Sequence, residues 1–446
     1  MSGLELDSLD HRFGTVIVAA TDVQGRLFGR RVPAKRFLDE LKDGVDICTC
    51  ALAWDISQDL ANAMTFAGGR AGWNDFRIVP DLATLRPYPG TSETAICIAD
   101  VVDEEGHPIP ESPRAVLRRQ LERATAAGYS VVLASELEFY LFHGSADRLR
   151  RKDFRRLEPT TLVRSDYSIV GQSGQEPFIG LVRRQMEAAG IEIHACQGEY
   201  GLGQWEVNFV HAGALEMADR HAIYKAGLKE LALANDLAAT FMARPLSHDM
   251  GSSCHLHCSL WRGDRPAFVS EDPRRLSDVG RHFVGGLVEH MDETAVFCAP
   301  YVNSYKRHIP DDFGGGLKAW GYDNRTVAVR AVGHGPSLHV EYRYPGADAN
   351  PYLAAAAMLA AGLDGVERGL DPGEPCTVNA YETGVEIAKT PRSLVDATAA
   401  FTGSRWVRDV FGGEVVEHYA AHAEAEWSGY LKAVTDWELK RAFELA

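Results

Sequence analysis

The alternation of hydrophobic and polar residues predicts that the chain begins with strands. Residues 13–32 are typical of a β-hairpin, with strands over 15–20 and 26–32 on either side of a turn at 22–25. A short helix is expected over 33–41, and two further strands are expected over 46–54 and 93–102. Four strands around one helix indicate a small α+β domain, which we place at residues 13–105.

The rest of the chain alternates between long helices and short strands. A linker over 104–111, rich in Glu, Gly and Pro, closes the first domain, and Pro113 then starts a helix that Gly128 ends. Further helices are expected over 178–189, 214–235, 277–292, 351–367 and 414–444. We therefore predict a second, larger α+β domain over residues 111–446.

The strand expected over 134–142 carries an anomaly on one face. Glu136 and Glu138 share that face, whereas Leu137, Phe139 and Leu141 share the other. Two carboxylates on so apolar a strand repel each other and lose hydration unless cations or a wet cavity compensate them. For this segment alone, a solvated acidic face on an edge strand is an equally good interpretation.

Three further segments show the same anomaly. Each has a strand-like run of apolar residues on one face and chemically reactive side chains on the other or in the adjoining loop. These side chains are Glu199 and Glu206, then His255, His257 and Ser259, then Glu341 and Arg343. A single segment of this kind is most often structural, but four such segments favour a common cavity. That cavity would gather Glu136, Glu138, Glu199, Glu206 and Glu341 with His255.

Five carboxylates and one imidazole without cysteine form a set of ligands suited to Mg²⁺ or Mn²⁺. Six ligands exceed what one Mg²⁺ that keeps its waters needs, so two or more ions are implied. Several metals beside Arg343 suggest phosphoryl transfer. Because the chain has neither a P-loop nor a dinucleotide-binding GxGxxG, basic residues such as Arg307, Arg325 and Arg330 are candidates to hold a nucleotide, although each alone could be a surface arginine.

Composition and charge narrow the class of protein. A net charge of −16, from 46 basic and 62 acidic side chains, argues against nucleic-acid or anionic-membrane partners. The first residues lack a secretory signal, and the longest apolar run, 351–363, is too short to span a bilayer. The eight cysteines form no CxxC pair, and Cys48 and Cys50 are interpreted as reduced core residues rather than a metal clip. We expect a cytoplasmic location.

Six ordered motifs together resemble the class I glutamine synthetase family over nearly the whole chain, and especially its γ-glutamylpolyamine and γ-glutamylethanolamide synthetases. The resemblance implies an N-terminal β-grasp domain, a C-terminal catalytic α/β domain and a dodecamer with active sites between neighbouring subunits. The motifs are Glu136/Glu138, Glu199/Glu206, residues 251–259, residues 303–310, Arg325/Arg330, and Glu341/Arg343 before residues 349–353.

The resemblance also implies a role for each residue. Glu138, Glu199 and Glu206 would bind one metal, and Glu136, His255 and Glu341 the second. His257 and Ser259 would contact ATP, with Arg325 and Arg330 on its phosphates. Gly251, Arg307 and Arg343 would hold glutamate, and Arg307, Arg325 and Arg343 would act in catalysis. The implied reaction forms γ-glutamyl phosphate from ATP and glutamate, after which an amine displaces phosphate.

Several positions depart from the family pattern. Phe313 stands where the family's flap has a Glu that helps to deprotonate ammonium, and the family's ammonium-binding Asp loop is replaced by residues 66–73. Met250 replaces an Asn, and His339 replaces an Arg. These departures favour an organic amine over ammonia, with Asp311 and Asp312 as candidate proton acceptors. The alternatives are a glutamine synthetase that uses ammonia and a non-catalytic scaffold or regulator.

Overall fold

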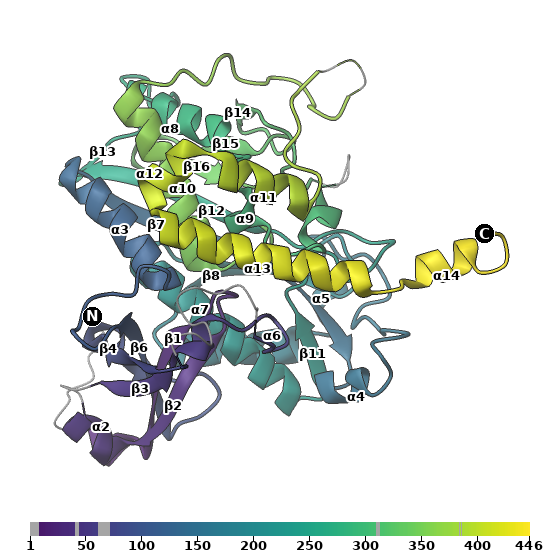
Figure 1. Ribbon diagram of the computed structural model, residues 1–446. Helices are drawn as coiled ribbons and strands as arrows, with labels where there is room; N and C mark the ends of the chain where they lie inside the picture. The colour runs from purple at the N-terminus through teal and green to yellow at the C-terminus, as the bar shows by residue number, and fades with distance from the viewer. Residues whose placement is uncertain (1–8, 41–43, 61–71, 309–312, 383, 385) are drawn as a thin grey trace.

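The structure is a computed structural model that describes residues 9–40, 44–60, 72–308, 313–382, 384 and 386–446. Two sheets organise the molecule, and Figure 1 shows them one below the other, with the N-terminal sheet at the bottom. Two separate hydrophobic clusters correspond to them, a large one around the second sheet and a smaller one within the first.

The first sheet has six strands in the order β2-β1-β6-β4-β3, with β5 paired to β6. The predicted hairpin is confirmed as β1 and β2, and the predicted short helix as α2. Short helix α1 (Leu9–Arg12) precedes them. The bounds are β1 (Thr15–Thr21), β2 (Leu27–Pro33), α2 (Ala34–Glu40), β3 (Val45–Cys48), β4 (Asp75–Pro80), β5 (Arg86–Pro87) and β6 (Thr94–Val102).

The strand expected over 46–54 is wrong beyond Cys48. There the chain turns into a 3₁₀ helix, η2 (Thr49–Leu52), because the Cys48 thiol caps it by accepting the Cys50 amide hydrogen at 3.4 Å. Strand β4, which pairs with both β3 and β6, was not expected from the sequence. The described part of the N-terminal unit therefore contains six strands, where four were expected.

The second sheet has ten strands, with the central order β14-β15-β16-β12-β7-β9-β8. Its longest strand, β7, pairs antiparallel with β12 on one side and β9 on the other. The bounds are β7 (Ser130–His143), β8 (Ile193–Gly198), β9 (Gln204–Phe209), β10 (Ala212–Gly213), β11 (Leu237–Thr240), β12 (Cys254–Arg262), β13 (Arg265–Pro266), β14 (Trp320–Tyr322), β15 (Val329–Val332) and β16 (His339–Tyr342).

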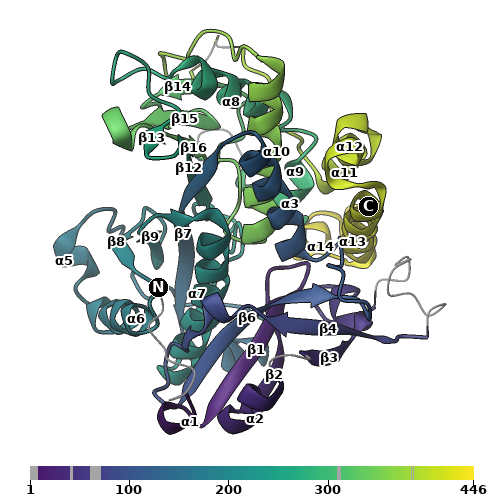
Figure 2. The same ribbon diagram turned by 90° about the vertical axis from the view of Figure 1, so that its left-hand side faces the viewer.

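Long helices cover one face of this sheet. Figure 2 shows α3, α7 and α10 on the same side of β7 and β12, and α10 contacts α3, α7 and α8. All the helices expected up to residue 367 are confirmed. The bounds are α3 (Pro113–Ala126), α4 (Ala146–Arg150), α5 (Ile169–Gln172), α6 (Glu176–Ala188), α7 (Ala214–Ala234), α8 (Asp278–Glu289), α9 (Ala295–Cys298), α10 (Pro351–Arg368), α11 (Leu394–Gly403) and α12 (Arg405–Phe411).

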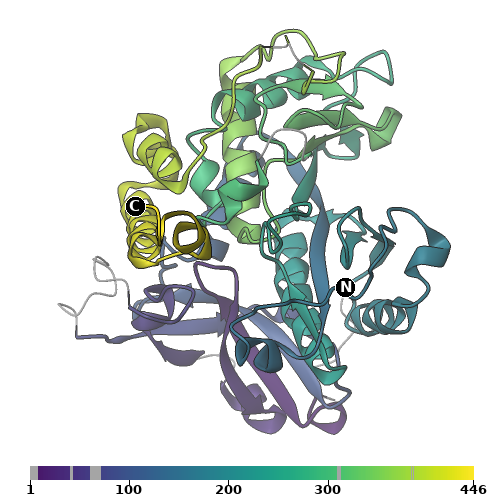
Figure 3. The same cartoon turned by 90° about the vertical axis from the view of Figure 1, so that its right-hand side faces the viewer.

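The single terminal helix expected over 414–444 is wrong, because the chain forms two helices there. Helix α13 (Gly413–Lys432) ends at Ala433, which is extended, and Thr435 then caps α14 (Asp436–Ala442) in a capping box with Glu438. Figure 1 shows α14 projecting away from the body, and Figure 3 shows the yellow C-terminal helices above the N-terminal sheet. We call residues 434–446 the C-terminal arm. Its Trp437 and Phe443 side chains are 67% and 82% exposed.

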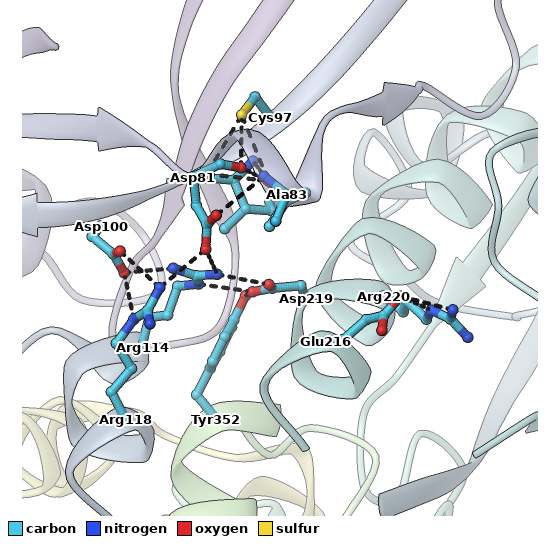
Figure 4. A network of polar contacts seen from close by, with 12 residues as sticks. Asp81, Ala83, Cys97, Asp100, Arg114, Arg118, Glu216, Asp219, Arg220 and Tyr352 are labelled. Carbon is cyan, nitrogen blue, oxygen red and sulfur yellow. Dashed lines mark hydrogen bonds and ion pairs between the residues drawn. The ribbon is translucent and has the colours of Figure 1, made fainter. Parts of the chain in front are cut away.

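A buried arginine fastens the first sheet to the helices that cover the second sheet (Figure 4). Arg114 of α3 donates to Asp219 of α7 at 3.0 and 2.9 Å, and to Asp100 of β6 and Asp81 at 2.5 and 2.8 Å. The Tyr352 hydroxyl of α10 donates to Asp219 at 2.6 Å. The pKa of Asp81 is lowered, because the arginine contacts outweigh the opposing effect of burial. One guanidinium thus joins acids from both parts of the chain.

No helix in the described part of the chain combines the length and the apolar character that crossing a membrane requires.

Candidate active site

A ladder of polar side chains crosses the second sheet on the face away from the helices. Strand register places Glu138 opposite Glu206, and Glu136 between Asn208 and His255. On the next strand across the sheet, Glu341 of β16 lies opposite His257 of β12 on one side and Arg330 of β15 on the other. The alternate residues of these strands, including Leu137, Val207, Leu256 and Val340, belong to the hydrophobic core. Because side chains alternate along a strand, packing one face against helices directs every ladder residue to the other.

His255 joins two groups of acidic residues. One ligand atom from each of Glu136, His255 and Glu341 lies within 4.8 Å of the others, and the same holds for Glu138, Glu206 and His255. The His255 Nδ1 atom lies 3.2 Å from Glu136 Oε2 and 3.5 Å from Glu341 Oε1. Its Nε2 atom is buried and has no partner in the described part of the chain. An Nδ1–H that donates to Glu136 leaves a free lone pair on Nε2, which suits metal coordination.

The carboxylates fall into two electrostatic classes. Burial and repulsion by Glu206 raise the pKa of Glu138 to about 8. Burial and repulsion by Glu138 raise the pKa of Glu199 to about 8 as well. Burial, Glu136 and Glu199 also raise the pKa of Glu206 well above its usual value. These three are the residues assigned from the sequence to one metal, and their protein surroundings supply too little positive charge to keep all three ionised.

The second class is already compensated by cations and hydrogen bonds. Burial would raise the pKa of Glu136, but hydrogen bonds from His255 and His257 outweigh it and lower that pKa. Burial would also raise the pKa of Glu341, but the charges of Arg343, the two histidines and Arg330 lower it to about 2. Burial and Arg343 lower the pKa of His255 to about 4, so its imidazole is neutral at pH 7.

Amide donors orient the carboxylates of the first class. Glu138 Oε2 accepts from the Gln204 side chain at 2.8 Å and from the Ser253 backbone at 3.0 Å. Glu206 Oε1 accepts from Asn208 at 2.9 Å and also from Gln197. Glu199 follows β8 in a loop, as expected, and stands outside the two groups that His255 joins.

The arginines predicted at the site differ in their surroundings. Arg343 donates to Glu341 Oε1 at 2.5 Å and Arg330 to Glu341 Oε2 at 2.9 Å. Arg330 also pairs with Asp323, a residue that the sequence interpretation passed over although it precedes the Arg325 motif. Arg325 is exposed and lies outside the ladder.

Arg307 is fully buried, and its guanidinium binds protein oxygens. Nη1 donates to Ser253 Oγ at 3.0 Å and to the Gly314 carbonyl at 2.9 Å, and Nη2 donates to the Tyr344 carbonyl. Gly251 permits this burial, since a Cβ atom there would lie 2.3 Å from Arg307 Cγ. Sequence reasoning missed the carbonyl partners of Arg307, because backbone oxygens carry no residue-specific signal.

The two residues predicted to contact ATP lie along β12. His257 Nε2 lies 3.2 Å from Glu136 Oε1, and its Nδ1 lies 2.9 Å from His339 Nε2. His339 Nδ1 donates to the Ser337 carbonyl at 2.6 Å, so its Nε2 is the acceptor for His257. Ser259 Oγ accepts from the Trp261 indole at 2.9 Å. His339 thus holds the ring of His257 in place.

The residues expected to receive the amine are only partly described. Phe313 is 47% exposed, and its ring packs edge-on against Tyr381 with centroids 5.7 Å apart. Trp73 packs with Ala53, Ala421 and Ala425 instead of near the ladder. Pro310, Asp311, Asp312 and residues 66–71 lie outside the described residues.

The comparisons with known proteins agree with this geometry. Residues 110–442 match the glutamine synthetase catalytic domain. The chain is 41% identical to the gamma-glutamylethanolamide synthetase of Streptomyces coelicolor, over 96% of this chain and 92% of that protein. It is 37% identical to a glutamate–isopropylamine ligase of a Pseudomonas species, over 98% and 96%. A solved GmaS/ADP complex superposes with a TM-score of 0.87 at 28% identity, covering all of both chains.

Proposed function

The chain belongs to the glutamine synthetase family, and on that premise we propose that it joins the γ-carboxylate of glutamate to an organic amine with the hydrolysis of ATP. It is an ATP-dependent carboxylate–amine ligase that forms γ-glutamyl amides. The observation that carries the proposal is the polar ladder, because two groups of acids that share one histidine suit a reaction that needs several divalent cations. The two relatives named above, which join glutamate to ethanolamine or isopropylamine, favour an organic amine.

We assign the metal ligands residue by residue. Glu138, Glu199 and Glu206 would hold one Mg²⁺ or Mn²⁺, and their raised pKa values are in keeping with carboxylates that need an added cation. The second ion would be held by Glu136, His255 and Glu341. The ions would neutralise charge that develops on the phosphate oxygens.

Other residues predicted at the site would bind the substrates. His257 and Ser259 would contact ATP, and Arg325 and Arg330 its phosphates. Gly251, Arg307 and Arg343 would bind glutamate. The Arg307 guanidinium would then exchange one of its carbonyl partners for a carboxylate of glutamate, because a carboxylate binds a guanidinium more strongly. Arg307, Arg325 and Arg343 are the proposed catalytic arginines.

The reaction proceeds in two balanced steps. A γ-carboxylate oxygen of glutamate attacks the terminal phosphorus of ATP, which forms γ-glutamyl phosphate and releases ADP. The amine nitrogen then attacks the acyl carbon, the C–O bond to phosphate breaks, and the departing phosphate takes up the proton that the nitrogen releases. Exclusion of water protects the acyl phosphate from hydrolysis until the amine arrives. The ring of Phe313 offers the amine's alkyl group an apolar contact where a carboxylate would favour ammonium.

We also propose the organisation that the resemblance implies. The first sheet with α2 would be a β-grasp domain over residues 13–105, followed by the catalytic domain over 111–446. The subunits would form a homo-oligomer, with twelve copies expected, and the apolar surface on the C-terminal arm supports such an association. All eight cysteines are unpaired, which is in keeping with the expected reducing cytoplasm.

Phosphate release from ATP and glutamate, measured over a panel of amines, tests the function. We expect turnover with ethanolamine, isopropylamine, a polyamine or another alkylamine, at a higher kcat/KM than with ammonia. Mass spectrometry should detect the γ-glutamyl amide. Formation of glutamine at the highest kcat/KM would contradict the choice of amine, and the absence of ATP turnover with every amine would contradict the ligase itself.

A further inference from the structure

The Arg307 guanidinium, proposed above to bind glutamate, is a buried charge without an adjacent counter-ion. Its hydrogen-bond partners are neutral oxygens of Ser253, Gly314 and Tyr344, and among the described residues it forms no ion pair. Its Nε atom is buried and has no hydrogen-bond partner there either. A buried charge destabilises a protein unless an opposite charge compensates it, so the source of that compensation decides how Arg307 is held.

Asp348, in the loop between β16 and α10, supplies part of that compensation. Burial lowers the pKa of Arg307, and the charges of Asp348 and then of Glu138 oppose that effect. Glu138 is assigned above to a metal ion, which would neutralise its charge. Asp348 is then the carboxylate that is left to balance the guanidinium.

The absence of a side chain at Gly346 brings Asp348 and Arg307 close together. A Cβ atom on residue 346 would lie 2.4 Å from Asp348 Oδ1 and 3.5 Å from Arg307 Nε. Both atoms therefore lie beside the same glycine, and both are buried without a hydrogen-bond partner in the described part of the chain. The two side chains thus interact through their charges and not through a direct hydrogen bond, and such an interaction is stronger in a poorly hydrated interior than in water.

A hydrogen bond also ties Asp348 to the segment that carries Arg307. Asp348 Oδ2 accepts from the Ser304 hydroxyl at 2.6 Å, and Ser304 and Arg307 are the first and last residues of a 3₁₀ helix, η5 (Ser304–Arg307). Ser304 Oγ accepts the Tyr301 amide hydrogen at 3.0 Å, which leaves its own proton for the carboxylate. Asp348 therefore fixes the start of the short helix whose end presents the guanidinium.

The loop that carries Asp348 is held on both sides of that residue. Lys225 Nζ, on α7, donates to the Ala347 carbonyl at 2.8 Å and to the Ala349 carbonyl at 3.4 Å. The Ala347 amide donates to the Ser252 carbonyl at 3.1 Å, next to the start of β12. The backbone around Asp348 is therefore fixed, and its carboxylate can serve as a firm reference point for Arg307.

We propose that Asp348 is a positioning residue for the ligase, which holds the Arg307 guanidinium in the orientation that binds the carboxylate of glutamate. Asp348 acts by its charge beside Gly346 and by its hydrogen bond to Ser304. It belongs to none of the groups assigned above to metal, ATP or glutamate. The inference rests on the proposed role of Arg307. Removing Asp348 leaves the guanidinium present but less well oriented, so glutamate binding weakens more than ATP binding or the chemical step.

Steady-state kinetics with glutamate and ATP varied separately test this role. Asp348→Ala should raise the KM for glutamate by about tenfold, with less than about a twofold change in the KM for ATP and less than about a threefold fall in kcat. Asp348→Asn keeps an acceptor for Ser304 but removes the charge, so it should raise the KM for glutamate by a smaller factor. Gly346→Ala places a methyl group 2.4 Å from Asp348 Oδ1 and should act in the same direction. If Asp348→Ala does not fold, these two variants carry the test.

Asp292→Ala is the matched control. Asp292 is also half-buried, with one oxygen bound by Lys318 at 2.7 Å and the other buried without a partner among the described residues. Its removal should leave the ratio of the two KM values unchanged. A rise in both KM values by the same factor in Asp348→Ala, or a rise in the control as large as in Asp348→Ala, would overturn the role.

Calorimetric titration of the wild-type chain with glutamate, in the presence of ADP and Mg²⁺, separates this inference from the proposed function. A wild type that neither turns over nor binds glutamate would contradict the ligase, and the positioning role with it. An active wild type whose KM for glutamate is unchanged in Asp348→Ala would contradict the positioning role alone.

Discussion

Glu138 and Glu206 occupy directly opposed positions on the antiparallel strands β7 and β9. Both side chains are buried on the same face, and neither has an arginine or lysine as a hydrogen-bonding partner among the described residues. Like charges directly opposite each other destabilise a sheet. The pair therefore destabilises the folded protein, and the divalent cation proposed to bind there would offset that repulsion.

The metal-free protein should lose stability as pH rises through neutrality. Glu138 and Glu199 have pKa values of about 8 in the folded protein, well above those of an unfolded carboxylate, so the folded state holds protons that the unfolded state has released. His255, whose folded pKa is about 4, contributes its own loss only below about pH 6.5. Between about pH 6.5 and 8, thermal unfolding in EDTA should show a falling Tm.

Saturating Mn²⁺ should remove or reverse that slope, since metal binding requires deprotonated ligands. Glu138→Gln should flatten it in EDTA. A metal-free Tm that rises between these pH values would contradict the electrostatic account of the ladder.

Removing a ligand from the second group should abolish turnover without unfolding the protein. Glu136→Ala and His255→Ala each take away one of the two side chains that converge with Glu341, so kcat should fall by about a hundredfold and Mn²⁺ binding should weaken. Glu192→Ala, an exposed carboxylate beside β8, is the matched control and should keep full activity. Full activity in either ligand variant would refute the metal assignment.

The ladder could be predicted from the sequence because it depends on a period of two. Once Leu137 and Leu256 face the core, the strand geometry alone sends Glu136 and His255 to the other face. Which strands are neighbours is a tertiary property, so the pairing of Glu138 with Glu206 needed the structure. The same holds for Arg307, whose partners include the carbonyl oxygens of Gly314 and Tyr344, which carry no residue-specific signal in the sequence.

Two errors in the predicted elements have local physical causes. Strand-forming residues continue past Cys48, but the thiol caps a 3₁₀ helix and ends β3. The break between α13 and α14 was predictable, because Thr435 and Glu438 have the spacing of a capping box. Helical periodicity on both sides of the break concealed it.

The buried arginine that joins the first sheet to the helices, Arg114, should make a large contribution to stability. Arg114→Met leaves buried Asp219 without the arginine that it binds and takes one of two arginines from Asp100, so we expect the free energy of unfolding to fall by about 3–5 kcal/mol. Urea denaturation measures the change. Arg118→Met, which removes a half-exposed arginine from Asp81 and Asp100 but not from Asp219, is the matched control and should cost about 1 kcal/mol or less. An equal loss of unfolding free energy in the two variants would show that burial of the ion pair does not determine its contribution to stability.

The C-terminal arm should be required for the full assembly. Trp437, Phe443 and Leu445 are largely exposed on a projecting segment, so deletion of residues 434–446 should shift the sedimentation profile from a large oligomer to smaller species. Trp437→Ser with Phe443→Ser should act in the same direction. A wild-type protein that sediments as a monomer at micromolar concentration while active would contradict the proposed oligomer.

Phe313 should control the choice between an organic amine and ammonia. An ammonium ion is stabilised by a nearby carboxylate that can then accept its proton, whereas an aromatic ring offers an alkyl group apolar contact and an alkylammonium a cation–π interaction. Phe313→Glu should therefore raise kcat/KM for ammonia relative to ethanolamine or isopropylamine by about tenfold, an amount typical of one lost or gained side-chain contact. Steady-state phosphate release at matched amine concentrations measures both constants.

The control for this exchange is Phe313→Leu, which keeps an apolar side chain but removes the ring that packs edge-on against Tyr381. If apolar contact with the alkyl group is what selects the amine, the leucine variant should keep most of the preference for isopropylamine. If the cation–π interaction selects it, the preference should fall in leucine and glutamate variants alike. A preference for ammonia in the wild-type protein, or no change in the ratio for Phe313→Glu, would show that the amine is selected elsewhere in the site.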